Sequence, residues 1–200
     1  MKQTKVFATL AFLLPLAFLP NTSNAQATAT ATQPLQLSAF VAATGTYTEL
    51  NGGRNGSITA GADLTFLNVP HVRPSLELRG TYPVDNGHIS TQKNFLIGPK
   101  VERQFGNFHP YADFLIGRGG IDYLNGGFIY GNTLYISSTT TVYSPGGGLD
   151  YDLTHHWSLK ADFQYQYWNT PAVPSGVIHP RVTTVGALDR FDFNEHHHRH

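Results

Sequence analysis

Ionisable side chains recur at alternate positions in several stretches of this chain, and they are of the types that acid–base chemistry uses. Ten of them fall on the polar rows of predicted strands: Asp63, Glu77, Arg79, Lys100, Glu102, Asp113, Asp150, Asp152, Lys160 and Asp162. Carboxylates beside bases resemble a catalytic constellation, but an enclosed interior in which charges must pair needs the same residue types. The sequence therefore predicts a polar network of paired charges, and the catalytic interpretation has no further support.

A second group of chemically capable residues is a histidine cluster near the end of the chain, His196, His197, His198 and His200. Imidazoles this close together can bind Zn²⁺, Ni²⁺ or Cu²⁺. No fixed outer ligands are expected to orient them. We therefore interpret the cluster as a weak, adventitious metal site or a tail without a chemical role, and expect no functional metal or cofactor. The pair His155 and His156 is interpreted as the tip of a tight hairpin.

The element that positions Lys160 and Asp162 is a strand with two different faces. Apolar and aromatic residues stand on one face: Trp157, Leu159, Ala161, Phe163, Tyr165 and Tyr167. Polar residues stand on the other: Ser158, Lys160, Asp162, Gln164 and Gln166. Successive side chains of a β-strand point to opposite faces, so this alternation predicts a strand over residues 157–167.

Seven further stretches alternate less regularly, giving eight predicted strands in all. They cover residues 35–49, 57–67, 74–82, 92–105, 111–122, 141–153 and 181–193. Phe40, Ala42 and Leu188 are apolar residues in the phase of the polar rows. Pro99 removes a ladder donor, which predicts a bulge or kink in the fourth strand.

The beginning of the chain has the composition of a secretory signal. Lys2 and Lys5 precede an apolar stretch over residues 6–19, and Ser23-Asn24-Ala25 supplies small residues for cleavage. The stretch is short for a membrane anchor, which is the alternative interpretation. We expect a signal peptide over residues 1–25, a flexible lead-in over 26–34, one β domain over 35–193 and a histidine-rich tail over 194–200.

Composition limits the class of protein. Thirteen acidic residues balance thirteen lysines and arginines, so no bulk field favours nucleic acid, and no cysteine is present for disulfides. Charged residues make up only 13% of the chain, against roughly 25% in an average soluble domain. The polar rows are otherwise mostly small or uncharged, whereas a water-facing surface carries Lys and Glu more densely.

This composition favours a barrel whose apolar rows face lipid and whose polar rows enclose a narrow lumen, the space inside the strands. Aromatic residues near the strand ends fit two interfacial girdles: Tyr47, Phe66, Tyr82, Phe105, Tyr143, Trp157, Tyr167 and Phe191. The connections after the second, fourth and sixth strands are predicted to be short. Those after the third, fifth and seventh are longer, including residues 124–138 and 169–180. The alternative is a secreted soluble β-barrel that binds a small apolar ligand.

Three segments carry a resemblance to a known family. They are Phe95-Leu96-Ile97-Gly98-Pro99-Lys100-Val101, then Pro110-Tyr111-Ala112 leading to Leu115-Ile116-Gly117, and finally Thr184-Val185-Gly186-Ala187-Leu188-Asp189-Arg190-Phe191. Over residues 35–193 the chain resembles the small outer-membrane β-barrel family related to the membrane domain of OmpA, also described as porin-family proteins. The resemblance implies an eight-stranded antiparallel up-and-down transmembrane barrel in the outer membrane of a Gram-negative bacterium.

The resemblance also implies partners: outer-membrane lipid around the barrel, and the barrel insertion machinery, which reads an aromatic near the end of the last strand. Phe191 or Phe193 fits that aromatic, although Asp189 stands where the pattern favours one and seven residues follow. Some such barrels are lipid A-modifying enzymes, and a deacylase needs Ser, His and an acid together on the outer surface. The predicted outer rows contain almost no histidine. We therefore predict a non-enzymatic protein of envelope integrity or surface interaction, with at most a narrow water or ion path and an unidentified external partner.

Overall fold

The structure is a computed structural model that describes residues 35–50, 53–67, 72–85, 87, 90–130 and 132–192. The predicted signal peptide, the lead-in, Phe193 and the histidine tail lie outside the described residues.

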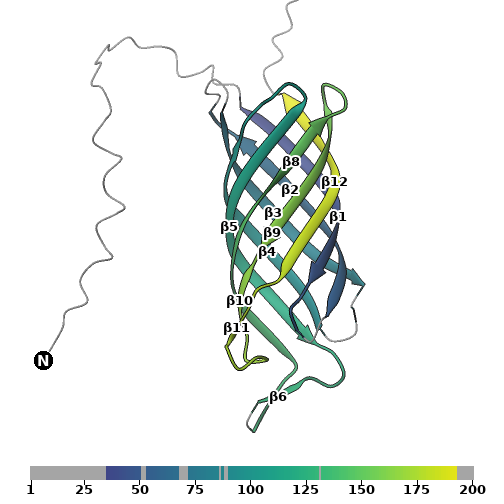
Figure 1. The fold of residues 1–200 in the computed structure, drawn as a ribbon, viewed down its shortest axis with the longest axis vertical. Coiled ribbons are helices and arrows are strands. Elements are labelled where there is room, and N and C mark those ends of the chain that lie inside the picture. Colours follow the sequence, from purple (N-terminus) through teal and green to yellow (C-terminus); the bar gives the residue numbers. More distant parts are fainter. Residues whose placement is uncertain are drawn as a thin grey trace, which may run out of the picture. The chain divides into compact units, whose positions relative to one another are not determined.

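Eight long strands close into an antiparallel barrel within the described part of the chain (Figure 1). Their bounds are β1 Gln36–Tyr47, β2 Arg54–Thr65, β3 Arg73–Asp85, β4 Ser90–Glu102, β5 Phe108–Tyr123, β8 Ser137–Asp152, β9 Trp157–Tyr165 and β12 Arg181–Asp192. Each pairs with its neighbour in the chain, and the β1–β12 pairing closes the ring. Closure pairs both sides of every long strand and leaves no open sheet edge. The predicted fold class is confirmed.

The two ends of the barrel differ. We call the end where β1 begins and β12 ends the turn end, at the top of Figure 1, and the opposite end the loop end. The turn-end connections span residues 66–72, 103–107 and 153–156. At the loop end, residues 124–136 and 166–180 form the two long connections, as predicted.

These long connections contain strand segments that the sequence did not predict. A small hairpin of β6 Phe128–Tyr130 and β7 Thr133–Tyr135 lies between β5 and β8. β10 Tyr167–Asn169 follows β9 and pairs with β8, and β11 Val177–Ile178 pairs with β10. Most strand bounds also differ from the predicted ones by one to four residues. β8 begins at Ser137, and β3 runs to Asp85, so the third connection shortens to residues 86–89.

The predicted bulge at Pro99 is wrong. Pro99 lies opposite Leu76 on β3, and the β4–β5 register is the same before it, at Ile97–Ile116, as after it, at Lys100–Asp113. The neighbouring Gly98 allows β5 to approach closely, since an added Cβ there would lie 2.1 Å from the Phe114 carbonyl oxygen. The register shifts instead between Gly56 and Ser57 of β2.

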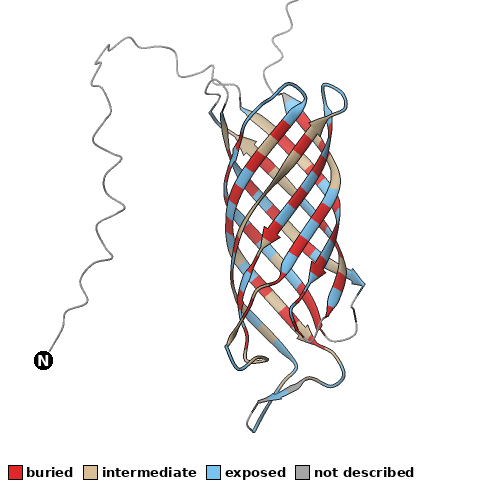
Figure 2. Ribbon diagram, in the orientation of Figure 1, coloured by how far each residue is buried: buried red, intermediate tan, exposed pale blue. Residues whose placement is uncertain are grey.

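Buried and exposed residues alternate along the strands, as Figure 2 shows. On β9, Trp157 is 52% and Phe163 is 48% exposed, whereas Lys160 is fully buried and Asp162 is 4% exposed. The predicted orientation, with apolar rows outward and charged rows inward, is confirmed. Phe40, Ala42 and Leu188 are buried inside, as their phase requires. All eight residues of the predicted aromatic girdles are exposed on the outside.

No helix long and apolar enough to span a membrane occurs among the described residues.

Candidate functional site: the charged interior of the barrel

Lys100 of β4 lies at the centre of one group of buried charges. Its Nζ is 2.8 Å from Asp63 Oδ2, 3.4 Å from Asp150 Oδ2 and 3.9 Å from Glu77 Oε2. The four side chains come from four different strands and are almost completely buried. An unpaired charge at this depth would lose its hydration without compensation, so these contacts allow the charges to be enclosed.

Arg79 of β3 joins the remaining carboxylates of this group. Its Nε donates to Glu77 at 2.6 Å, and its two terminal nitrogens donate to the two oxygens of Asp162 at 2.8 and 3.2 Å. Asp113 lies 3.6 Å from the same guanidinium. The bidentate contact with Asp162 fixes the orientation of the guanidinium as well as its charge.

Two aromatic rings lie beside the buried cations. Lys160 Nζ lies 4.7 Å from the Phe40 ring centroid and 4.2 Å from that of Tyr111, and Lys100 Nζ lies 4.0 Å from the Tyr111 centroid. Lys160 also lies 3.7 Å from Glu77. The faces of aromatic rings attract cations, so Tyr111 stabilises both ammonium groups and Phe40 stabilises that of Lys160.

Neutral donors complete the central group. Gln164 Nε2 donates to both carboxylate oxygens of Asp113 at 2.9 Å, and Tyr111 donates its hydroxyl hydrogen to Asp162 at 2.9 Å. Ser144 in turn donates to Gln164 at 2.7 Å. Five carboxyl side chains here face three basic ones, Arg79, Lys100 and Lys160. The added donors therefore offset part of the acidic excess.

Glu102 and Asp152 belong to a second group, at the turn end. His109 lies between them, with Nδ1 2.9 Å from Glu102 and Nε2 2.8 Å from Asp152. Arg190 pairs with Asp152, and Arg73 lies 3.6 Å from Glu102. The ten predicted residues thus form two groups, two beneath the turns and eight deeper in the lumen.

The sequence did not single out His109, Phe40 or Tyr111 as members of these groups. The signal for His109 was its place in the same alternation as Tyr111 and Asp113, but the predicted fifth strand began too late to include it. The signal for Phe40 was an apolar residue in a polar row. Gly61 opposite Phe40 leaves room for the ring, since an added Cβ would lie 2.5 Å from it.

An apolar cluster fills part of the lumen at the loop end, and the sequence did not predict it. It consists of Leu50, Leu96, Leu115, Ile121, Tyr123, Val142, Trp168 and Ile178. Trp168 donates its indole hydrogen to Gln166 at 2.9 Å and packs against Gly119, where an added Cβ would lie 2.3 Å from the ring. This cluster closes the β5, β8 and β10 side of the lumen.

The other side of the loop end is hydrophilic. Thr44 contacts Thr59 at 2.6 Å and Thr184 at 3.1 Å, and Thr59 contacts Thr81 at 2.9 Å, so a ladder of hydroxyls crosses β12, β1, β2 and β3. Buried polar side chains on β2 and β4 face the same side: Asn55, Ser57, Ser90 and Gln92. Hydroxyl and amide groups of this kind hydrogen-bond water, so any water path would follow this strip.

The described residues contain no group of three or more His, Cys, Asp or Glu arranged to hold a metal ion. Within those residues the interior carboxylates contact cations or neutral donors, an arrangement that holds charge in place. On the outer surface, His179 lies 3.4 Å from Glu49, and its ring stacks on Tyr165. This pair is an imidazole with a carboxylate partner, which sequence reasoning missed because it expected a loop there.

Comparison with family models and with curated proteins finds no match. Among solved structures, the chain is similar to Neisserial surface protein A, with a TM-score of 0.54, 18% identity, and coverage of 80% of this chain and 97% of that one. It also aligns with Ail, the attachment invasion locus protein of Yersinia pestis, with a TM-score of 0.49, 15% identity, and coverage of 80% and 100%. The outer membrane enzyme PagL aligns with a TM-score of 0.44, 15% identity, and coverage of 78% and 98%.

The similarity to Neisserial surface protein A is a similarity of fold. It agrees with the eight paired strands, the inward charges and the outward apolar rows described above. The described chain therefore has the fold of the small eight-stranded outer-membrane β-barrels.

Proposed function

We propose that this protein is a non-enzymatic β-barrel of the bacterial outer membrane that supports envelope integrity or presents its loop end for surface interaction. One observation carries the proposal: an ion-paired, side-chain-filled interior lies inside an apolar outer surface with aromatic residues near both ends. Lipid solvates such a surface, whereas water does not.

The same observation argues against a soluble carrier of a small apolar ligand. Such a carrier needs an apolar pocket inside and a hydrated surface outside. Here the lumen holds eight ionisable side chains in contact with one another, and the apolar cluster around Trp168 is closely packed. The outer rows instead expose large apolar side chains such as Phe95, Ile97 and Val185.

The proposed partners follow from this placement. Lipid surrounds the apolar rows, and the insertion machinery reads the closing strand β12 near Phe191, whose side chain is exposed. The long connections at residues 124–136 and 166–180 are the proposed site of contact with an external partner. The predicted signal peptide directs export in this proposal.

Fractionation tests the proposal. The protein expressed in a Gram-negative host is expected in the outer-membrane fraction, resistant to extraction by carbonate or urea. In detergent gels it is expected to migrate as a compact species until it is boiled. Recovery in the aqueous periplasm or medium without detergent would overturn the membrane assignment.

Planar-bilayer recording tests the filled lumen. Because ion pairs and the apolar cluster occupy the lumen, we expect no steady, large conductance from the purified protein. An eight-stranded barrel is only wide enough for side chains to fill. Brief small steps would fit a water path along the hydroxyl strip, and steady porin-like currents would contradict the filled lumen.

An enzyme acting on lipid A is the second candidate, because Glu49 and His179 form an outer-surface acid–imidazole pair. A deacylase would also need a hydroxyl nucleophile within hydrogen-bond reach of the imidazole. No hydrogen bond joins a Ser or Thr hydroxyl to His179 among the described residues. Lipid A mass spectrometry with and without expression should therefore show the same species. A new lipid A species that forms when the unmodified protein is expressed, but not when a His179→Ala variant is expressed, would establish the enzyme instead.

A further inference from the structure

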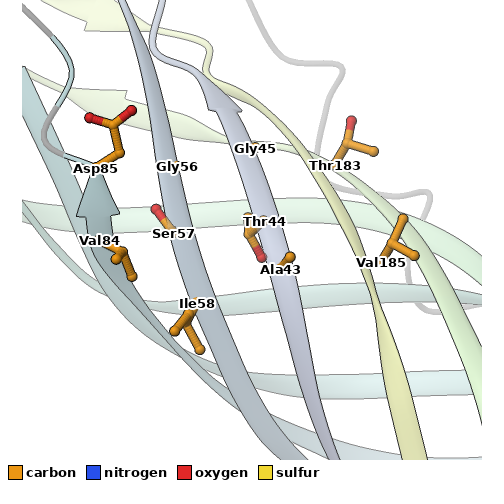
Figure 3. A pocket seen from close by; sticks show the side chains of 10 residues that line it. All are labelled: Ala43, Thr44, Gly45, Gly56, Ser57, Ile58, Val84, Asp85, Thr183 and Val185. Carbon is orange, nitrogen blue, oxygen red and sulfur yellow. The ribbon is translucent and has the colours of Figure 1, made fainter.

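A groove crosses the outer surface of β12, β1, β2 and β3 at the loop end (Figure 3). It has a volume of about 620 Å³, and a second hollow of about 400 Å³ adjoins it through Gly45 and Thr183. Figure 3 shows side chains from all four strands around it, among them Ala43, Ile58, Val84 and Val185. The lining is thus mainly small or aliphatic.

Gly45 creates the depth of this groove. It lies on the outer face of β1 between Ala43 and Tyr47, and a Cβ added there would meet no atom within 4 Å. Thr183 stands beside it on β12 and Gly56 on β2. A trough of small residues between larger ones fits one acyl chain, which gains dispersion contacts along its length.

Two arginines stand at the loop-end margin of the groove. Tyr47 pairs with Arg54 on one side and with Arg181 on the other, so the three residues form one row across β2, β1 and β12. Both arginines are exposed, and neither forms an ion pair with another described residue. Their backbones are two strand spacings apart, about 10 Å. Both guanidiniums can reach a phosphate placed over Tyr47.

The nearby carboxylates have other partners. Asp85, which lies opposite Gly56 on the β3 side of the groove, accepts a hydrogen bond from the Gly87 amide at 3.2 Å, and Glu49 pairs with His179 at 3.4 Å. Two arginines and the single carboxylate of Asp85 leave this end of the groove with a net positive charge. An occupant that fits this net charge and the small, aliphatic lining has an anionic head at the arginines and an apolar tail in the trough.

We propose that this groove binds an anionic membrane lipid, with its phosphate between Arg54 and Arg181 and one acyl chain lying along Gly45. The proposal rests on the membrane location proposed above, which presents this face to lipid. The loop end is the external end in that location. The ligand is therefore a phosphorylated lipid of the outer leaflet.

Native mass spectrometry of the full chain in detergent tests the site, with lipid A as the probe and lipid A freed of its phosphates as the matched lipid. An Arg54→Gln/Arg181→Gln double variant is expected to bind lipid A about tenfold more weakly, because charge-assisted contacts are lost. Its binding of the dephosphorylated lipid should not change. Gly45→Leu, which fills the trough, should weaken binding of both lipids.

Two variants serve as controls. Gly80→Leu adds the same side chain on the outer face of β3, outside the groove, where a Cβ makes only an ordinary contact with Phe95 at 3.8 Å. Arg118→Gln removes an exposed arginine from β5. Neither control should change lipid A binding.

Equal binding by all variants would overturn the inference. Displacement of lipid A by millimolar inorganic phosphate alone would also overturn it, because the acyl chain would then contribute nothing. Heat-modifiable mobility is measured first for each variant. A folded membrane barrel with unchanged lipid binding contradicts only this inference, whereas a protein recovered without detergent contradicts the proposed function.

Discussion

At the scale of single residues, the interior depends on paired charges rather than on isolated ones. Lys100 contacts carboxylates from three other strands, and Arg79 contacts Glu77 of its own strand and carboxylates from two other strands. In contrast, Lys93 and Asp122 form an ion pair at 2.8 Å with side chains 48% and 44% exposed. Burial makes the first arrangement sensitive to the loss of a partner and the second insensitive.

Replacing Lys100 should therefore destabilise the barrel strongly. Lys100→Met leaves Asp63 without a cation and Asp150 with Lys160 alone, 4.0 Å away, and removal of one partner from a buried pair costs about 3–5 kcal/mol. The matched Lys93→Met variant should lose only about 0–1 kcal/mol. The free energy of unfolding in lipid vesicles, measured by urea titration, gives both values. Adding Asp63→Asn to Lys100→Met should recover part of the loss, and equal losses in the two lysine variants would contradict buried pairing.

At the scale of elements, each strand carries its own two faces, and glycines decide where neighbouring side chains fit between strands. Gly61 on the inner face of β2 accommodates the ring of Phe40 and lies against the Leu78 carbonyl oxygen, 2.4 Å from an added Cβ. Gly80 on the outer face of β3 has ordinary space around it. Inner glycines are thus part of the packing, whereas this outer one is replaceable.

The comparison of Gly61→Ala with Gly80→Ala tests this difference. Gly61→Ala must displace β3 or the Phe40 ring, and overpacking of this kind costs about 1–3 kcal/mol. Gly80→Ala is expected to be neutral or slightly stabilising because glycine weakens a strand interior. The midpoints of urea unfolding in vesicles measure the difference. A Gly61→Ala variant as stable as the unmodified protein would show that barrel stability does not depend on the close packing of the Phe40 ring against residue 61.

At the scale of the whole molecule, the outer surface of the closed barrel determines whether lipid or water solvates it more favourably. Ala161 is exposed in the middle of β9, opposite Val185 on β12 and Leu149 on β8. His155 lies on the turn between β8 and β9, at one end of the barrel. The two positions differ in their depth along the barrel, which matters only if lipid surrounds it.

An added charge at these two positions distinguishes lipid from water. Ala161→Arg should destabilise the bilayer-inserted protein by about 2–4 kcal/mol, and His155→Arg by about 0–1 kcal/mol. Urea unfolding in vesicles compares the two. If the variants were equally stable, the band around Ala161 would not lie in the hydrocarbon region.

Much of this arrangement was predictable, because strand alternation is local. The two faces of β9, the inward phase of Leu188 and the outward phase of Val185 follow from residues one and two positions away. The shapes of the long connections were not predictable in this way. The pairing of β10 with β8, which lengthens the wall beside Trp168, depends on residues far apart along the chain. The β6–β7 hairpin is local, but its three-residue strands are too short to show an alternation.

The sequence by itself determined the class of fold, the inward placement of the ten ionisable residues and the outward placement of the aromatic residues of the girdles. The reason is that the two-residue alternation of a strand is visible in consecutive residues. Only the tertiary structure decided which charges meet, that Glu102 and Asp152 join His109 apart from the others, and that Trp168 closes one side of the lumen. It also brought Arg54 and Arg181 to either side of Tyr47. Partner choice across a barrel depends on register and closure, which bring together residues that no local pattern connects.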